Sequence, residues 1–155
     1  MLLIAVMAAA GHGAASGSQT VTVSAVQAID ITVPAAESIA STPPGSCGTT
    51  STTVNVKSNK YWNLQVRSEP TNYANGKAKN GSSTEMVNAF PYRRGGAGSF
   101  INITSSFGPI LFGLGSQTKT NGRDVTIDYQ HCVDWLDDAG SYTIVVEYLG
   151  YQPQG

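Results

Sequence analysis

Apolar and polar residues alternate along several segments of the chain, and no segment keeps the period of an amphipathic helix over a useful length. Alternation with a period of two is typical of strands that bury one face. The segments are bounded by Gly, Pro, Asn and Asp, which favour turns. The expected strands are at residues 19–33, 49–57, 61–67, 86–92, 99–105, 109–114, 122–135 and 141–149. We therefore predict an all-β, antiparallel two-sheet β-sandwich of about eight strands.

Two pairs of neighbouring segments have the form of β-hairpins. The C-terminal pair, residues 122–135 and 141–149, flanks a short acidic turn that contains a glycine. Its two apolar faces comprise Val125, Ile127, Tyr129, Val133 and Trp135, and Tyr142, Ile144, Val146 and Tyr148. The other pair, residues 49–57 and 61–67, directs inward Val54, Val56, Trp62, Leu64 and Val66. We expect these faces to line the core.

The N-terminal run, residues 19–33, is the longest expected strand. One face of the run carries Val21, Val23, Ala25, Ile29, Ile31 and Val33, with Gln27 as an interruption, and Pro34 ends the run. Fully extended, the run would reach roughly 45–50 Å, whereas an ordinary strand has about 5–6 residues. Two interpretations stay open. The run kinks near Gln27 and serves both sheets of its own domain, or it pairs with a neighbouring subunit.

Length and charge narrow the class of protein. The chain has 155 residues, is 41% hydrophobic and 12% charged, and carries a net charge of −1. This length suits one folded domain, which we place at residues 19–155. Lys and Arg form no stripe, so we expect no binding of nucleic acid. A neutral surface rich in Ser, Thr, Asn and Gln suits an extracellular or assembling protein.

Residues 1–18 resemble a secretory leader. Leu2 to Ala10 form a short apolar run, and the small residues at 14–17 suit cleavage. No Lys or Arg precedes the apolar run, which departs from the usual leader. The run is too short to span a bilayer. We expect a cleaved leader and an extracellular, cell-surface protein without a membrane span; retention of the segment is the alternative.

Cys47 and Cys132 are the only cysteines of the chain. In a secreted protein an even count favours a disulfide, and two buried free thiols are the alternative. The alternation places Cys132 on the face opposite Val125, Ile127 and Tyr129. A bridge on the outer face of the sheet, or a bulge near His131, would reconcile a disulfide with this pattern.

The sequence contains no recognisable catalytic or cofactor motif, so we expect a non-enzymatic protein without cofactors. His131 lies on the inward face of its strand, where a structural role is favoured over that of a catalytic base. A small hydrolase would need it exposed beside a nucleophile. Asp134, Asp137 and Asp138 offer oxygen atoms that could bind calcium, but their spacing matches no dedicated calcium loop.

Two triplets, Asn80-Gly-Ser and Asn102-Ile-Thr, fit the acceptor pattern for N-glycosylation. Asn80 lies in a turn-rich stretch, residues 69–98, that we expect to be a surface loop, whereas Asn102 lies within an expected strand. Exposed aromatic side chains would suit sugar stacking or subunit packing. We expect Trp62 and Trp135 to lie in the core or half-buried in a sheet instead.

The segment Asp138-Ala-Gly-Ser-Tyr142 is similar to the tyrosine corner of immunoglobulin-like domains. The resemblance implies that the Tyr142 hydroxyl bonds back to nearby backbone and pins the end of a strand. Ile144 stands where immunoglobulin domains carry a cysteine. The resemblance favours an immunoglobulin-like sandwich, and a jelly roll is the other two-sheet form.

In immunoglobulin-like domains another strand follows this tyrosine-containing strand, whereas here only residues 150–155 follow. A sheet edge without its last strand, together with a long apolar N-terminal strand, resembles the plan of fibre subunits built by donor-strand complementation. Such subunits include chaperone–usher pilins, archaeal bundling pilins and the biofilm fibre protein TasA. The resemblance implies a homopolymeric filament, a pilus, fimbria or biofilm fibre, in which each subunit donates residues 19–33. The alternative is a secreted adhesin or carbohydrate-binding module that binds glycans through residues 69–98.

Overall fold

The computed structural model describes residues 19–108, 112–115 and 121–153, so the expected leader lies outside the described residues. Within them the chain is all-β, as predicted, and its strands pair antiparallel. The strands are β1 (Ile29–Thr32), β2 (Cys47–Ser58), β3 (Trp62–Ser68), β4 (Lys79–Asn80), β5 (Pro91–Arg94), β6 (Ile101–Asn102), β7 (Phe112–Gly115), β8 (Arg123–Cys132), β9 (Tyr142–Thr143) and β10 (Val146–Tyr151). None of the described residues belongs to a helix that is long and apolar enough to span a membrane.

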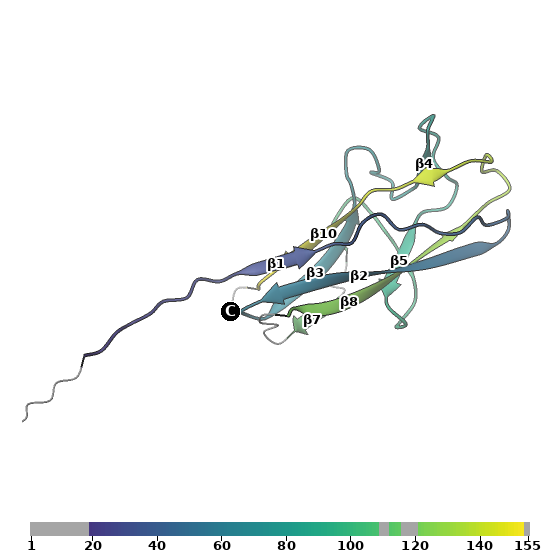
Figure 1. Cartoon of the computed structure of the whole chain (residues 1–155). Coiled ribbons are helices and arrows are strands. Elements are labelled where there is room, and N and C mark those ends of the chain that lie inside the picture. The colour runs from purple at the N-terminus through teal and green to yellow at the C-terminus, as the bar shows by residue number, and fades with distance from the viewer. Residues whose placement is uncertain (1–18, 109–111, 116–120, 154–155) are drawn as a thin grey trace, which may run out of the picture.

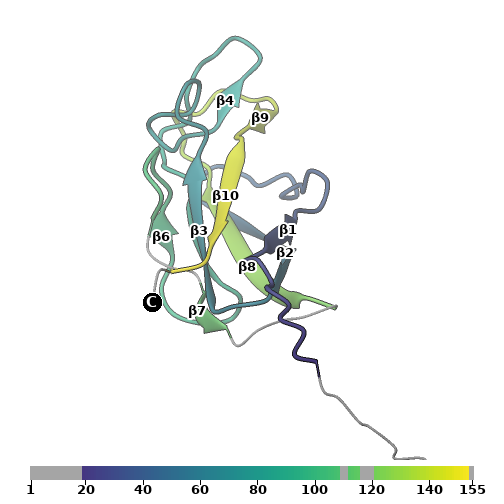
Figure 2. The same ribbon diagram turned by 90° about the vertical axis from the view of Figure 1, so that its left-hand side faces the viewer.

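The strands form a larger sheet, a smaller sheet and a separate pair. The larger sheet has the order β1-β2-β8-β5-β6, the smaller one has the order β10-β3-β7, and β4 pairs with β9 (Figures 1 and 2). The long pair β2 and β8 forms the centre of the larger sheet, in register from Cys47 opposite Cys132 to Val56 opposite Arg123. This pair defines the long axis of the larger sheet, and the positions of the other strands are described relative to it.

One cluster of buried side chains contains residues from strands of the larger sheet and of the smaller sheet. The members from β2, β5 and β8 are Val54, Val56, Tyr92, Val125, Ile127 and Tyr129, and those from β3 are Trp62, Leu64 and Val66. Ile103, just after β6, completes the cluster. All are at most 5% exposed. The inward positions predicted for residues 49–57 and 61–67 are therefore confirmed.

Neither predicted hairpin forms. β2 and β3 are joined by a short connection but belong to different sheets. β8 and β10 also belong to different sheets, and β9 lies between them in the chain. The chain thus crosses between sheets at both places. A hairpin and such a crossing both direct two alternating apolar faces toward one core, so alternation and turn residues do not distinguish them. The inward faces were predicted correctly, but the pairing partners were wrong.

The prediction that Trp135 lies in the core or half-buried in a sheet is wrong. β8 ends at Cys132, and the Trp135 side chain is 79% exposed, whereas Trp62 is fully buried. The chain leaves the sheet because a carboxylate oxygen of Asp134 accepts a hydrogen bond from the Leu136 backbone N–H at 3.0 Å. Side chains of Asp commonly form such local bonds, which compete with a strand ladder.

Candidate assembly site

The N-terminal run divides into two parts with different structures. Only Ile29–Thr32 form a strand, so the predicted continuous strand over residues 19–33 is wrong. Residues 19–28, which we call the arm, belong to no strand and are exposed throughout. Val21 and Val23 are 74% and 87% exposed. Figures 1 and 2 show the arm extending away from the sheets.

β1 is seated on its own domain. It pairs with β2, from Ile29 opposite Ser58 to Thr32 opposite Asn55, and Ile29 and Ile31 pack against the buried cluster. A Cβ atom at Gly150 of β10 would lie 2.7 Å from Cγ2 of Ile31, so the close approach of β1 requires glycine there. Ile29 and Ile31 therefore complete their own domain in this structure and are not free to be donated, contrary to the expectation. Val33, after β1, remains 43% exposed.

Two side chains hold the base of the arm. The Asn59 Oδ1 atom accepts a hydrogen bond from the Ala28 backbone N–H at 2.9 Å, and Asn59 Nδ2 donates to the Val26 carbonyl oxygen at 2.7 Å. Gln152 Nε2 donates to the Ala28 carbonyl oxygen at 2.8 Å. These bonds fix the point at which the arm leaves the domain.

β10 is an edge strand among the described residues. It pairs with β3 on one side, and β1 approaches it at Gly150 without forming a ladder with it. Alternate backbone N–H and C=O groups of an edge strand point away from its partner and can pair with another strand. β10 is thus the edge where the sequence resemblance expects a strand to be missing.

The segment that leads into β10 contains the contact that the tyrosine-corner resemblance implies. The Tyr142 hydroxyl donates a hydrogen bond to the Asp138 carbonyl oxygen at 2.9 Å. Deeper in the domain, the hydroxyls of Tyr129 and Tyr148 hydrogen-bond to each other and link β8 to β10. Burial raises the pKa of both phenols, so both stay neutral over the physiological range.

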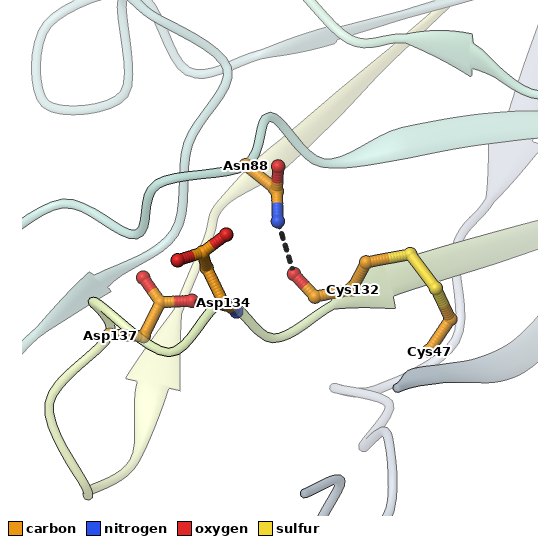
Figure 3. Close-up of a disulfide and its surroundings, with 5 residues drawn as sticks. All are labelled: Cys47, Asn88, Cys132, Asp134 and Asp137. Carbon is orange, nitrogen blue, oxygen red and sulfur yellow. Dashed lines mark hydrogen bonds between the residues drawn. A yellow bond between two sulfur atoms is a disulfide. The ribbon is translucent and has the colours of Figure 1, made fainter. Parts of the chain in front are cut away.

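The predicted disulfide is confirmed. Cys47 and Cys132 lie directly opposite each other on β2 and β8 and are bonded, with 85 residues of sequence separation (Figure 3). Their neighbours Gly48 and His131 belong to the inward-facing register, so the bridge lies on the outer face of the sheet, one of the two arrangements expected. Asn88 Nδ2 donates to the Cys132 carbonyl oxygen at 2.8 Å and holds the same end of β8.

Two of the three aspartates considered as calcium ligands stabilise the turn that follows β8. Asp137 accepts hydrogen bonds from the backbone N–H groups of Val87 at 2.7 Å and Asp134 at 2.8 Å. Figure 3 shows the Asp134 and Asp137 side chains within this turn. Among the described residues no three His, Cys, Asp or Glu side chains are grouped so that they could hold a metal ion. Asp134, Asp137 and Asp138 therefore give no support to a calcium site.

His131 is buried, with 8% exposure, and its ring stacks on Phe90 at 6.2 Å between centroids. Neither ring nitrogen has a hydrogen-bond partner within the part of the chain that the structure describes. Burial lowers the pKa of His131, and the negative charge of Asp137 offsets part of this effect. The hydrolase interpretation required an exposed His131 beside a nucleophile, and the structure does not provide this arrangement.

A polar network on the outer face of the larger sheet was not predicted. The Asp128 carboxylate accepts hydrogen bonds from Ser51 Oγ at 2.7 Å, Arg93 Nε at 3.0 Å and the Gly96 backbone N–H at 2.9 Å. The Gly96 N–H, followed by the Ser51 hydroxyl, lowers the pKa of Asp128. Because these residues are distant in sequence, only the strand order β2-β8-β5 brings them together.

The two glycosylation candidates occupy different settings. Asn80 is half-buried, and its Oδ1 atom accepts hydrogen bonds from the backbone N–H groups of Ser82 and Thr84 at 3.0 and 2.9 Å. Asn102 is exposed on the edge strand β6. Asn80 also borders a polar hollow of about 260 Å³ lined by Asn72, Tyr73, Lys79, Asn80, Gly81, Ser83 and Thr143.

Comparisons with protein-family models, with curated proteins and with solved structures find no match to this chain.

Proposed function

We propose that this protein is a structural subunit of an extracellular filament, of the pilus, fimbria or biofilm-fibre type, and that each subunit donates its arm to the next. The observation that carries the proposal is the arm itself. It is an exposed, β-prone segment that has no partner strand among the described residues, and it leaves the domain at a point fixed by Asn59 and Gln152.

The composition of the arm suits strand addition. Residues 19–28 read Gln-Thr-Val-Thr-Val-Ser-Ala-Val-Gln-Ala, with no charge and no proline. β-branched residues favour strands, and an extended segment of this length would span roughly 30 Å. When such a segment adds to a sheet edge, backbone hydrogen bonds supply affinity and alternate side chains supply register. The donated segment is thus shorter than residues 19–33.

The proposed receiving domain is an immunoglobulin-like sandwich in which the larger sheet and the smaller sheet are the two layers. A buried cluster shared by both sheets and the Tyr142 bond to Asp138 support this architecture. β10 is the proposed edge to which the arm of a neighbour adds. The disulfide supports an extracellular location, because such bonds persist in oxidising compartments.

The proposal is tested by removing the arm. A chain of residues 29–155 keeps β1, and its far-ultraviolet circular dichroism and melting temperature should match those of residues 19–155. We expect the longer chain to form filaments in electron microscopy and the shorter one to stay monomeric. A matched control replaces residues 19–28 by a Gly-Ser segment of equal length, and it should also stay monomeric. Filaments formed by either altered chain would contradict the proposal.

A glycan-binding module is the second candidate function. It is favoured by the polar hollow beside Tyr73 and Asn80, which residues of the 69–98 region line together with Thr143. This region is where the alternative interpretation of the sequence places glycan binding. The hollow is smaller than the usual ligand pocket of about 300–1,000 Å³. Glycan-array binding by a monomeric chain, lost on Tyr73→Ala, would favour this function over the filament.

A further inference from the structure

The turn after β8 presents a second exposed apolar surface, which we call the Trp135 tip and define as Val87, Trp135 and Leu136. Their side chains are 40%, 79% and 82% exposed. Trp135 and Leu136 are adjacent in sequence, so two large apolar side chains stand in water together. A tryptophan can bury about 150–250 Å² at an interface, and such residues often dominate binding energy. The tip therefore has the character of an interaction surface.

The tip is held in place rather than left loose. The Leu136 backbone N–H bonds to Asp134, and the Val87 backbone N–H bonds to Asp137 at 2.7 Å. At its base, Gly45 N–H donates to the Val133 carbonyl oxygen at 2.8 Å, next to the Cys47–Cys132 disulfide. A surface that is ordered before binding loses less conformational entropy when a partner arrives.

The tip and the arm lie at opposite ends of the long strand pair. The arm leaves beside Ser58, the last residue of β2, because Ile29 pairs there. The first residue of β2, Cys47, pairs with Cys132, and the chain then continues directly to Trp135. β2 separates the two ends by roughly 35 Å at about 3.3 Å per residue. A contact between unlike ends of identical subunits does not have to close, and it then builds a filament.

We propose that the Trp135 tip of one subunit binds the arm of a second copy of this chain, with Val21 and Val23, which share one face of an extended arm, against Trp135 and Leu136. This inference rests on the proposed function and adds the contact by which the neighbour first receives the arm. Each of these valines is at least 74% exposed, so the arm and the tip both carry apolar area that the single chain leaves in water. Burying such area contributes roughly 25 cal/mol per Å² before the costs of association.

Charge favours the arm of a second copy over a lipid surface. The tip is flanked by the acidic residues Asp134, Asp137 and Asp138, which would be repelled by anionic headgroups. The arm contains no charged side chain. Its docking beside these carboxylates therefore brings no second charged side chain into the contact. The two surfaces are therefore compatible in charge as well as in polarity.

The test uses the chain of residues 19–155 with a photo-crosslinking amino acid at position 136 and, separately, a Trp135→Ser/Leu136→Ser double variant. We expect crosslinks from position 136 to residues 19–28 of another chain, and at least a tenfold slower filament growth for the double variant with an unchanged melting temperature. Ile101→Ser is the matched control, because Ile101 is an exposed apolar residue on the edge strand β6, and it should grow filaments at the normal rate.

The outcomes separate this inference from the proposed function. If removal of the arm abolishes filaments but the double variant grows them normally, the tip contact is wrong and arm donation stands. Crosslinks from position 136 only to other parts of the chain would also overturn the inference. If residues 19–155 form no filament and the tip instead binds glycans or lipid vesicles, both are wrong.

Discussion

β1 and the arm come from one run of similar residues, yet one is folded into the domain and the other is not. Ile31 packs against the buried cluster and lies next to Gly150, where a larger residue would collide with it. The Val23 side chain, in contrast, is 87% exposed to solvent. Both segments alternate, and both contain β-branched residues. The difference shows that strand propensity needs an available edge before it produces a strand.

The boundary between the two segments has a simple geometric cause. Ile29 pairs with Ser58, the last residue of β2, and the chain turns away at Asn59. Residues before Ile29 therefore run past the end of the sheet, where no backbone of β2 remains for them to pair with. A neighbouring subunit can supply the missing edge, which is why the arm and not β1 is the donated segment in our account.

Loss of the disulfide should weaken the domain and leave the arm unchanged. For cysteines separated by 85 positions in the sequence, chain-entropy arguments give about 4–5 kcal/mol of stabilisation. We expect reduction, or Cys47→Ala/Cys132→Ala, to lower the free energy of unfolding by roughly that amount in urea titrations. Limited proteolysis within residues 19–28 should proceed at the same rate in both forms. A faster cleavage of the arm after reduction would show that the two regions are coupled, because a weakened domain would release an arm that it held.

Matched aspartate substitutions should separate β1 from the arm directly. Ile31→Asp places a charge against the buried cluster and should cost about 2–4 kcal/mol of unfolding free energy. Val23→Asp changes an exposed residue and should alter stability by at most about 0.5 kcal/mol. Chemical denaturation measures both. The same Val23→Asp chain should fail to form filaments, because the donated segment would carry a charge into the neighbour.

A loss of stability of similar size for both variants would mean that the arm is folded onto its own domain. Normal filaments from Val23→Asp, with the domain intact, would mean that its side chain is not part of the subunit contact. Either result would remove the distinction between the two segments.

Acidification should produce the smallest effect, again in the domain alone. Burial holds the pKa of His131 below its ordinary value near 6.5, so the unfolded chain binds a proton at a higher pH than the folded chain does. Stability from the neutral ring is thus fully present above about pH 6.5 and declines as the pH falls through that value toward the folded pKa. The backbone N–H groups of Asn72 and Thr71 lower the pKa of Glu69 to about 2, and the pKa of Asp128 is lowered as well. These two carboxylates therefore change the stability only in more acidic solution.

Thermal melts between pH 7.5 and 5.5 measure the histidine effect. His131→Phe keeps a ring to stack on Phe90 and removes the titrating group, so its melting temperature should vary less with pH over this interval. An identical pH profile in the variant would show that another group is responsible.

The sequence predicts which residues face the core better than it predicts which strands are neighbours. Val54, Trp62 and Leu64 could be assigned inward because alternation is a local property. The crossing from β2 to β3 could not be predicted. A short turn can join two strands of the same sheet or two strands of different sheets, and the same residues face inward in both cases. Cys47 and Cys132 could be paired because no other cysteines compete.

The candidate site was predicted only in part. The apolar arm is visible in the sequence, but its end at Ala28 depends on where β2 stops, which is a long-range property. Trp135 was misplaced because its parity matches that of the inward residues of β8, while the bond from Leu136 N–H to Asp134 had already turned the chain out of the sheet. Both errors occur where a local pattern continues beyond the strand that it describes.

The most direct test of arm donation is amide hydrogen exchange of residues 19–28 in the monomer and in the filament. We predict rapid exchange from Thr20 to Gln27 in the monomer, where the Ala28 N–H is already bonded to Asn59. In the filament we predict strong protection at alternate arm amides, with β1 protected in both states. Equal and rapid exchange of the arm in both states would contradict the account, because a donated strand must hydrogen-bond its backbone to the neighbour.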